Sequence, residues 1–92
     1  MLRLDHVVYA VPDLDEAAVR FREEFGLDST EGGRHERWGT ANRIVPLGDQ
    51  YLELVAAVDE PVAAETAFGG GVLERAAGGG GWFTIAAVAD DL

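Results

Sequence analysis

The sequence contains no cysteine and no lysine, and its only serine is Ser29. Without cysteine, disulfides and thiolate metal sites are excluded, and a reducing cytoplasm is the expected compartment. Ser29 lies in an acidic turn with no histidine obviously paired to it, so nucleophilic catalysis has little support.

Long hydrophobic runs are also missing. No apolar stretch approaches the roughly 20 residues that span a bilayer, and the first residues enter a predicted strand without the layout of a signal peptide. Basic residues are few, 7 against 17 acidic ones, which gives a net charge of −10. Such a charge repels phosphate backbones and anionic lipid, so we expect neither a nucleic-acid partner nor a membrane partner.

The chain has 92 residues, of which 48% are hydrophobic. This length predicts one small domain with a packed core. A chain this short buries a modest fraction of its surface, so pairing with a second copy as a homodimer is expected.

The first element is a predicted strand over residues 4–10. Alternation puts Leu4, His6, Val8 and Ala10 on one face and Asp5, Val7 and Tyr9 on the other. Pro12 stops the strand, and Asp13 has the character of a helix N-cap. Apolar residues then recur at helical spacing over residues 14–25, and Gly26 follows as a C-terminal cap.

The middle of the chain predicts a β-hairpin. Two apolar strands, residues 40–47 and 50–57, are joined by the tight turn Gly48-Asp49. The preceding polar segment, residues 28–37, is expected to turn at Gly32-Gly33, with a short strand over residues 27–31. The order is then strand, helix, strand, strand, strand.

The last third is rich in alanine and glycine. Residues 62–68 and 72–77 predict two short helical turns separated by three glycines, and residues 78–81 predict a flexible tether. Residues 82–88 read as another strand. Val88-Ala89-Asp90-Asp91-Leu92 then parallels Val11-Pro12-Asp13-Leu14, so a strand leads into an Asp-Leu helix start twice. We therefore predict an α+β fold with a complete unit over residues 1–60, a helical and glycine-rich linker over 61–81, and the first strand of a second unit over 82–92.

His6 and Glu53 are the main candidates for chemistry. The neighbours of Glu53, Leu52 and Leu54, should face the helix, so the carboxylate should share a concave face with His6. Imidazole nitrogen and carboxylate oxygen together suit Zn²⁺, Ni²⁺, Mn²⁺ or Fe²⁺, which could chelate two adjacent substrate oxygens. The alternatives are a histidine hydrogen-bonded inside a small barrel and an ion pair of Glu53 with Arg43.

Five further residues are candidates for substrate contact. Tyr51 shares a face with Glu53 and could offer its hydroxyl to a ligand. Trp38 could stack on a ligand at the mouth of the cavity, and Asn42 could hydrogen-bond to it; ordinary packing and hairpin support is the alternative for both. The remaining two are His35, which is otherwise a solvated loop histidine, and Arg43.

The order and spacing of several motifs resemble the glyoxalase-like members of the vicinal oxygen chelate superfamily. The opening motif is Leu4-Asp5-His6-Val7-Val8-Tyr9-Ala10-Val11-Pro12-Asp13-Leu14-Asp15-Glu16-Ala17. The middle motif is Trp38-Gly39-Thr40-Ala41-Asn42-Arg43, followed by Tyr51-Leu52-Glu53-Leu54. The linker and the start of the second unit are similar at Leu73-Glu74-Arg75-Ala76-Ala77 and Trp82-Phe83-Thr84.

The resemblance implies a pair of βαβββ units whose curved sheets enclose a cavity with a divalent metal. It implies that His6 and Glu53 are the metal ligands of the first unit, with Glu53 also a catalytic candidate. The second unit would supply the other ligands. Thr84, or Phe83 after a slip of one residue, stands at the matching position of its first strand, and neither is a good ligand.

The leading functional hypothesis is small-molecule binding or metal-dependent chemistry on a compound with vicinal oxygens. Isomerase, lyase and dioxygenase activities all occur on this fold, so the resemblance names no reaction. The alternatives are a non-catalytic protein that sequesters a ligand without a cofactor, and a half-domain that needs a partner chain.

Overall fold

The computed structural model describes the backbone of residues 2–89 and the side chains of residues 6–81. The strands are β1 (Leu2–Ala10), β2 (Thr30–His35), β3 (Thr40–Leu47), β4 (Gln50–Ala57) and β5 (Gly81–Ala89). The helices are α1 (Leu14–Phe25), α2 (Glu60–Ala64) and α3 (Ala67–Ala77). The predicted second Asp-Leu helix start at residues 90–92 lies outside the described residues, as do the side chains of Phe83 and Thr84.

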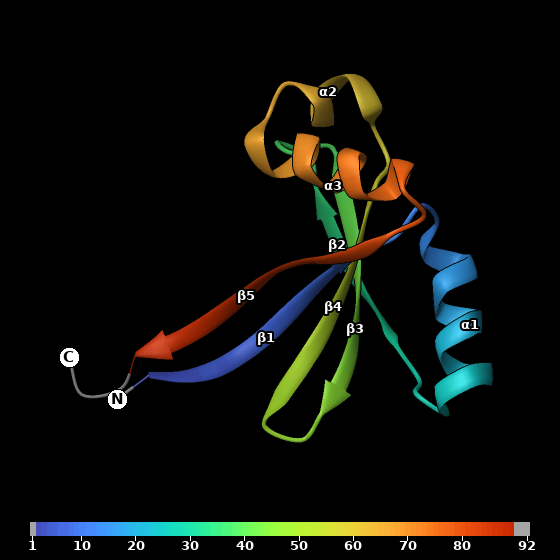
Figure 1. The fold of residues 1–92 in the computed structure, drawn as a ribbon, viewed down its shortest axis with the longest axis vertical. Helices are drawn as coiled ribbons and strands as arrows, with labels where there is room; N and C mark the ends of the chain where they lie inside the picture. The colour runs from blue at the N-terminus through green and yellow to red at the C-terminus, as the bar shows by residue number, and fades with distance from the viewer. Residues whose placement is uncertain (1, 90–92) are drawn as a thin grey trace.

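The five strands form one sheet in the order β2-β3-β4-β1-β5 (Figure 1). β1 is parallel to β4 and antiparallel to β5, and the β2–β3 and β3–β4 pairs are antiparallel. The predicted α+β class and the order strand, helix, strand, strand, strand are confirmed. β5 joins this βαβββ unit as one further strand on the free edge of β1.

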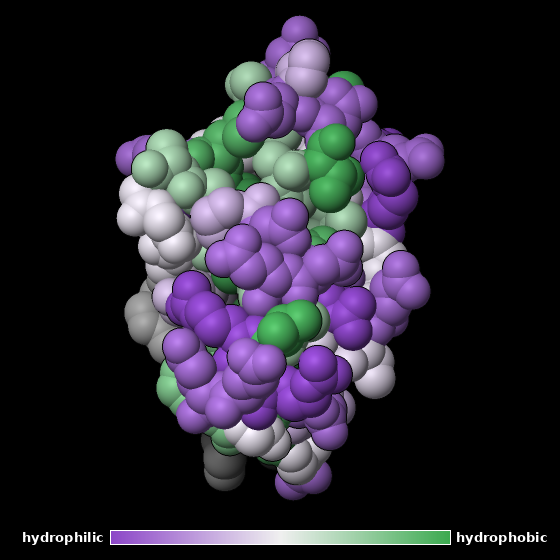
Figure 2. Space-filling view, turned by 90° about the vertical axis from the view of Figure 1, so that its right-hand side faces the viewer, coloured by the Kyte–Doolittle hydropathy of each residue, from purple (hydrophilic) through white to green (hydrophobic). Residues whose placement is uncertain are grey.

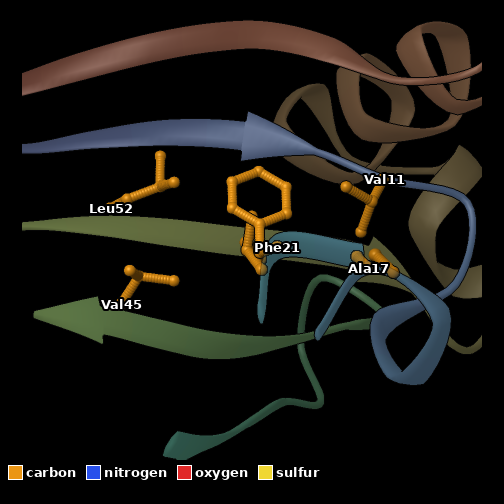
Figure 3. Close-up of a cluster of buried hydrophobic side chains, with 7 residues drawn as sticks. Val11, Ala17, Phe21, Val45 and Leu52 are labelled. Carbon is orange, nitrogen blue, oxygen red and sulfur yellow. The ribbon is translucent and has the colours of Figure 1, made fainter. Parts of the chain in front are cut away.

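The helix α1 has the predicted bounds and caps. The Asp13 side chain accepts a hydrogen bond from the Glu16 backbone N–H, and Gly26 ends the helix with a left-handed φ of 66°. One face of α1 packs on the sheet through Ala17 and Phe21, against Val11, Val45, Leu52, Leu54 and Ala56 (Figure 3). Val7 and Tyr9 border this cluster, as the alternation of β1 predicts.

The opposite face of the sheet has a second hydrophobic cluster. Val8 and Ala10 of β1 and Val55 of β4 pack there against Val72 of α3, with Phe68 at the border. The helices α2 and α3 lie together over one end of the sheet (Figure 1). The rest of this face carries the polar side chains discussed below.

The predicted strand over residues 27–31 and the predicted turn at Gly32-Gly33 are wrong. The strand is β2, over Thr30–His35, and both glycines lie inside it. The register shifts between Glu31 and Arg34, so two glycines face a single residue of β3. The glycines therefore mark a β-bulge, the other common reason for glycine within a strand.

The predicted break at Gly69, Gly70 and Gly71 is also wrong, because α3 runs through all three. A Cβ at Gly69 would lie 2.6 Å from Ala63 Cα and 2.5 Å from the Trp38 carbonyl oxygen. Close packing of α3 on α2 and on the β2–β3 turn thus requires glycine at this position. Tertiary packing outweighs the low helix propensity of glycine here.

The face of the molecule that carries α1 is hydrophilic over its middle and lower parts, and hydrophobic residues gather in its upper part (Figure 2). Among the described residues, no helix is both long enough and apolar enough to cross a membrane.

Phe21→Ala should destabilise the fold by about 3 kcal/mol, because it removes a large side chain from the core and leaves a cavity. Phe21 is 8% exposed and makes edge contacts with the rings of Tyr9 and Phe25. Urea unfolding followed by circular dichroism measures the loss. Val19→Ala, at a position 43% exposed on the same helix, is the control and should change stability by less than about 0.5 kcal/mol. Equal losses would contradict the described packing of α1.

Gly69→Ala and Gly70→Ala should have opposite effects on stability. At Gly69 the new methyl group overlaps backbone atoms, whereas at Gly70 it would lie 4.0 Å from the Ala63 carbonyl oxygen. Gly70→Ala should stabilise α3 by about 0.5–1 kcal/mol through helix propensity, and Gly69→Ala should destabilise the protein. Thermal unfolding of the two variants tests this, and a gain in stability from Gly69→Ala would contradict the close helix approach.

Candidate functional site

His6 and Glu53 meet on the face of the sheet opposite α1. β1 and β4 are parallel neighbours, with His6 opposite Tyr51 and Val8 opposite Glu53. His6 Nε2 lies 3.4 Å from Glu53 Oε1, and the side chains are 18% and 12% exposed. The two groups are close enough to form an ion pair when the imidazole is protonated. They converge as the alternation of the two strands predicts.

Tyr51 lies beside His6 on the same face. Its ring stacks on the imidazole with centroids 4.5 Å apart and planes inclined by 8°. Parallel strands place these two residues directly opposite each other, so the stack follows from the register. It limits the rotation of the His6 ring and so helps to direct Nε2 toward Glu53.

Asn42 of β3 binds the other oxygen of the carboxylate. Its Nδ2 donates to Glu53 Oε2 at 2.9 Å and lies 3.3 Å from His35 Nε2. Its Oδ1 accepts a hydrogen bond from the Gly33 backbone N–H at 2.8 Å. Asn42 therefore connects His35 to the same glutamate that His6 contacts directly.

The alternative of an ion pair between Glu53 and Arg43 is wrong. Arg43 pairs in register with Leu54, which faces α1, so its side chain starts on the other side of the sheet. Its guanidinium donates to the Ser29 hydroxyl at 2.8 Å and to the Ser29 carbonyl at 3.1 Å. Arg43 thus anchors the segment before β2 and does not join the cluster around Glu53.

His35 and Trp38 extend the cluster toward α3. The His35 and Trp38 rings have centroids 5.2 Å apart, and Trp38 and Phe68 are 4.9 Å apart. Trp38 is 40% exposed. A shallow hollow of about 480 Å³ opens here, lined by Arg34, His35, Glu36, Arg37 and Trp38. A planar ligand could reach both rings from this side.

Two donors of a metal site are therefore adjacent. An imidazole nitrogen and a carboxylate oxygen are ordinary ligands of Zn²⁺ and of other divalent transition metals. Within residues whose side chains are described, no group of three or more histidine, aspartate or glutamate side chains could hold a metal. His6 and Glu53 thus fit part of a metal site, and further ligands would have to join them.

Strand alternation predicts that His6, Glu53 and Tyr51 lie together, but the bond from Asn42 to Glu53 was not predicted. The hairpin register contains the missing signal. A two-residue turn pairs Leu47 with Gln50, so Ile44 pairs with Glu53 and Asn42 falls on the same face one step along. Neither the bond of Asn42 to Gly33 nor the contact of Trp38 with Phe68 has a comparable signal.

Three solved structures are similar to this chain over nearly its whole length. A hypothetical protein from Staphylococcus aureus has a TM-score of 0.76 and 24% identity, over 99% of this chain and 38% of that one. A methylmalonyl-CoA epimerase from Mycobacterium tuberculosis has a TM-score of 0.73 and 25% identity, over 97% of this chain and 56% of that one. The Streptomyces coelicolor methylmalonyl-CoA epimerase, in complex with 2-nitronate-propionyl-CoA, has a TM-score of 0.76 and 22% identity, over 98% and 62%.

The chain thus spans less than two thirds of the length of each of these neighbours. No match was found among curated protein sequences. The family model described as a glyoxalase-like domain matches residues 4–92. Fold, motifs and this match agree, and the chain belongs to the glyoxalase-like domain family.

Proposed function

We propose that this chain supplies half of a divalent-metal site that binds a small molecule with two adjacent oxygens. The observation that supports this most is the 3.4 Å approach of His6 Nε2 to Glu53 Oε1 on the face opposite α1. The strands β1 and β4, which hold both residues, lie next to each other inside the sheet, so their separation is fixed by backbone hydrogen bonds. Functional groups on such rigid elements hold their geometry well.

The ligand set suits Zn²⁺, Ni²⁺, Mn²⁺ or Fe²⁺. When bound, such a metal would polarise a substrate oxygen and lower the cost of developing negative charge. The role of His6 is to hold the metal through Nε2. Glu53 would hold it through Oε1 or, as the catalytic residue, take a proton from the substrate at that oxygen.

Substrate contacts would come from residues beside this pair. Tyr51 stacks on His6 and carries a hydroxyl, and Asn42 bonds to Glu53. His35 and Trp38 line the neighbouring hollow. The proposal does not extend to Arg43, whose guanidinium is bound to Ser29.

The remaining ligands would come from a second unit. In this proposal, residues 1–60 form a complete unit, residues 61–81 a linker, and residues 82–92 the first strand of a second, incomplete unit. A second copy of the chain is one source of that unit. A second copy that pairs by backbone hydrogen bonds would add at β5 or β2, the outer strands of the described sheet.

Sequestration of a ligand without catalysis is the second candidate function. It is favoured by the lack of three or more metal-ligating side chains among the described residues. The epimerase names of two structural neighbours favour an enzyme instead. In either case the lack of cysteine supports our expectation that the protein works in the reducing cytoplasm.

Metal titration tests the leading proposal. Purified protein dialysed against Ni²⁺ or Zn²⁺ should retain the metal, and Glu53→Gln or His6→Ala should weaken binding by about tenfold or more, since each removes one ligand. Glu74→Gln makes the same charge change as Glu53→Gln at an exposed position of α3, and it should bind like the wild type. Equal binding by all variants would show attraction to the acidic surface alone and would refute the proposal.

The stoichiometry of that titration tests the source of the other ligands. A site shared by two copies should bind one metal for every two chains and should assemble as the metal is added. Sedimentation equilibrium with and without metal measures the molecular mass and so shows whether the chain is a monomer or a dimer. One metal per chain on a monomer would contradict a shared site.

Acetohydroxamate, a small chelator with two adjacent oxygens, separates the two candidate functions. Metal-assisted binding predicts that Ni²⁺-loaded protein binds it and that protein treated with EDTA does not. Calorimetry measures both cases, and the Glu53→Gln variant is the control. Equal binding after EDTA treatment would favour a metal-independent sequestering protein.

A further inference from the structure

The β-bulge in β2 lies directly opposite Asn42. On β3, Arg43 pairs with Glu31 and Ala41 pairs with Arg34, so Asn42 alone faces the two glycines of the bulge. A bulge of this kind redirects the side chains around it and is a common device next to functional sites. Because the bulge lies opposite Asn42, we infer that it makes room for the Asn42 side chain and orients it.

Both glycines accommodate the amide group of Asn42, each in a different way. Gly33 donates its backbone N–H to Asn42 Oδ1 at 2.8 Å. A Cβ at Gly32 would overlap Asn42 Oδ1 and lie 2.9 Å from Asn42 Cγ, whereas a Cβ at Gly33 would have no neighbour within 4 Å. The absence of a side chain at Gly32 thus creates the space that the amide fills.

The hydrogen bond from the Gly33 N–H determines which end of the Asn42 amide is the oxygen and which is the nitrogen. An N–H donor can only meet the amide oxygen, so the nitrogen must face Glu53 and His35. Asn42 Nδ2 has two hydrogens, and Glu53 Oε2 and His35 Nε2 take one each. His35 Nε2 must then be an acceptor, which places the hydrogen of the neutral imidazole on Nδ1.

We propose that Asn42 is a positioning residue, seated in the glycine bulge, that holds Glu53 through Oε2 and fixes the tautomer of His35. Because Asn42 binds Oε2, Oε1 is the carboxylate oxygen that faces His6. Oε1 would therefore bind the metal or accept a proton from the substrate. The first part of this inference is independent of metal. The consequence for metal binding rests on the function proposed above and deepens it, because second-layer hydrogen bonds orient metal ligands.

The tautomer of His35 tests, in metal-free protein, whether the glycine bulge holds the Asn42 amide as proposed. Long-range ¹H–¹⁵N spectra at about pH 8, where an ordinary imidazole is neutral, distinguish a hydrogen on Nδ1 from one on Nε2. The wild type should show His35 with its hydrogen on Nδ1. Asn42→Ala should move it toward Nε2, the form that imidazole prefers in water, and a wild-type His35 already protonated at Nε2 would overturn the proposal.

Gly32→Ala and Gly33→Ala form a matched pair. Gly32→Ala should displace the Asn42 amide and shift the His35 tautomer, as Asn42→Ala does. Gly33→Ala keeps the backbone N–H that binds Asn42, so its spectrum should match that of the wild type. The same spectrum from both would overturn the role of Gly32. If Gly32→Ala does not fold, Asn42→Ala and Gly33→Ala still decide the question, because neither adds an atom to a crowded place.

Metal affinity tests the consequence at Glu53. Asn42→Ala should weaken Ni²⁺ binding by about 10-fold, in the range typical of lost second-layer bonds, with Gly33→Ala as the control. Unchanged affinity in Asn42→Ala would overturn the positioning of Glu53. Absence of Ni²⁺ binding by the wild type would refute the proposed function instead, and the tautomer result would still stand or fall by itself.

Discussion

The structure depends on a carboxylate held inside a sheet. Glu53 is buried and lies on β4 between Leu52 and Leu54, which are buried under α1. A buried carboxylate without partners would be costly, so its surroundings must compensate for lost water. His6 and Asn42 do so from the strands on either side of β4. One residue thus ties three strands together and also sets the chemistry that this face can perform.

Much of this arrangement could be predicted from local patterns. Strand alternation placed His6 with Glu53, and the Asp13 cap and helical spacing gave α1 its bounds. The two-residue turn gave β3 and β4 their bounds. These features depend on neighbours in the sequence or on strict periodicity, which is why residue patterns predict them.

Glycine was where prediction failed. Gly32-Gly33 and Gly69-Gly70-Gly71 have the composition of turns, yet the first pair lies in a bulged strand and the three lie in a helix. In both places glycine is used because another part of the chain comes close, Asn42 in one case and Ala63 with Trp38 in the other. Such reasons are tertiary, and a single sequence carries no sign of them. The alternative ion pair of Glu53 with Arg43 failed similarly, since Asn42 and Arg43 are adjacent in sequence but face opposite sides of the sheet.

The pairing of β1 with β5 has a consequence for how the chain is made. These strands come from opposite ends of the described chain and pair along most of their length. During synthesis, β1 can find β4 earlier but must keep its other edge open until residues 81–89 leave the ribosome. An open edge strand pairs readily with foreign strands, and contacts distant in sequence form slowly. Until β5 emerges, the open edge of β1 is therefore a site at which the nascent chain can aggregate.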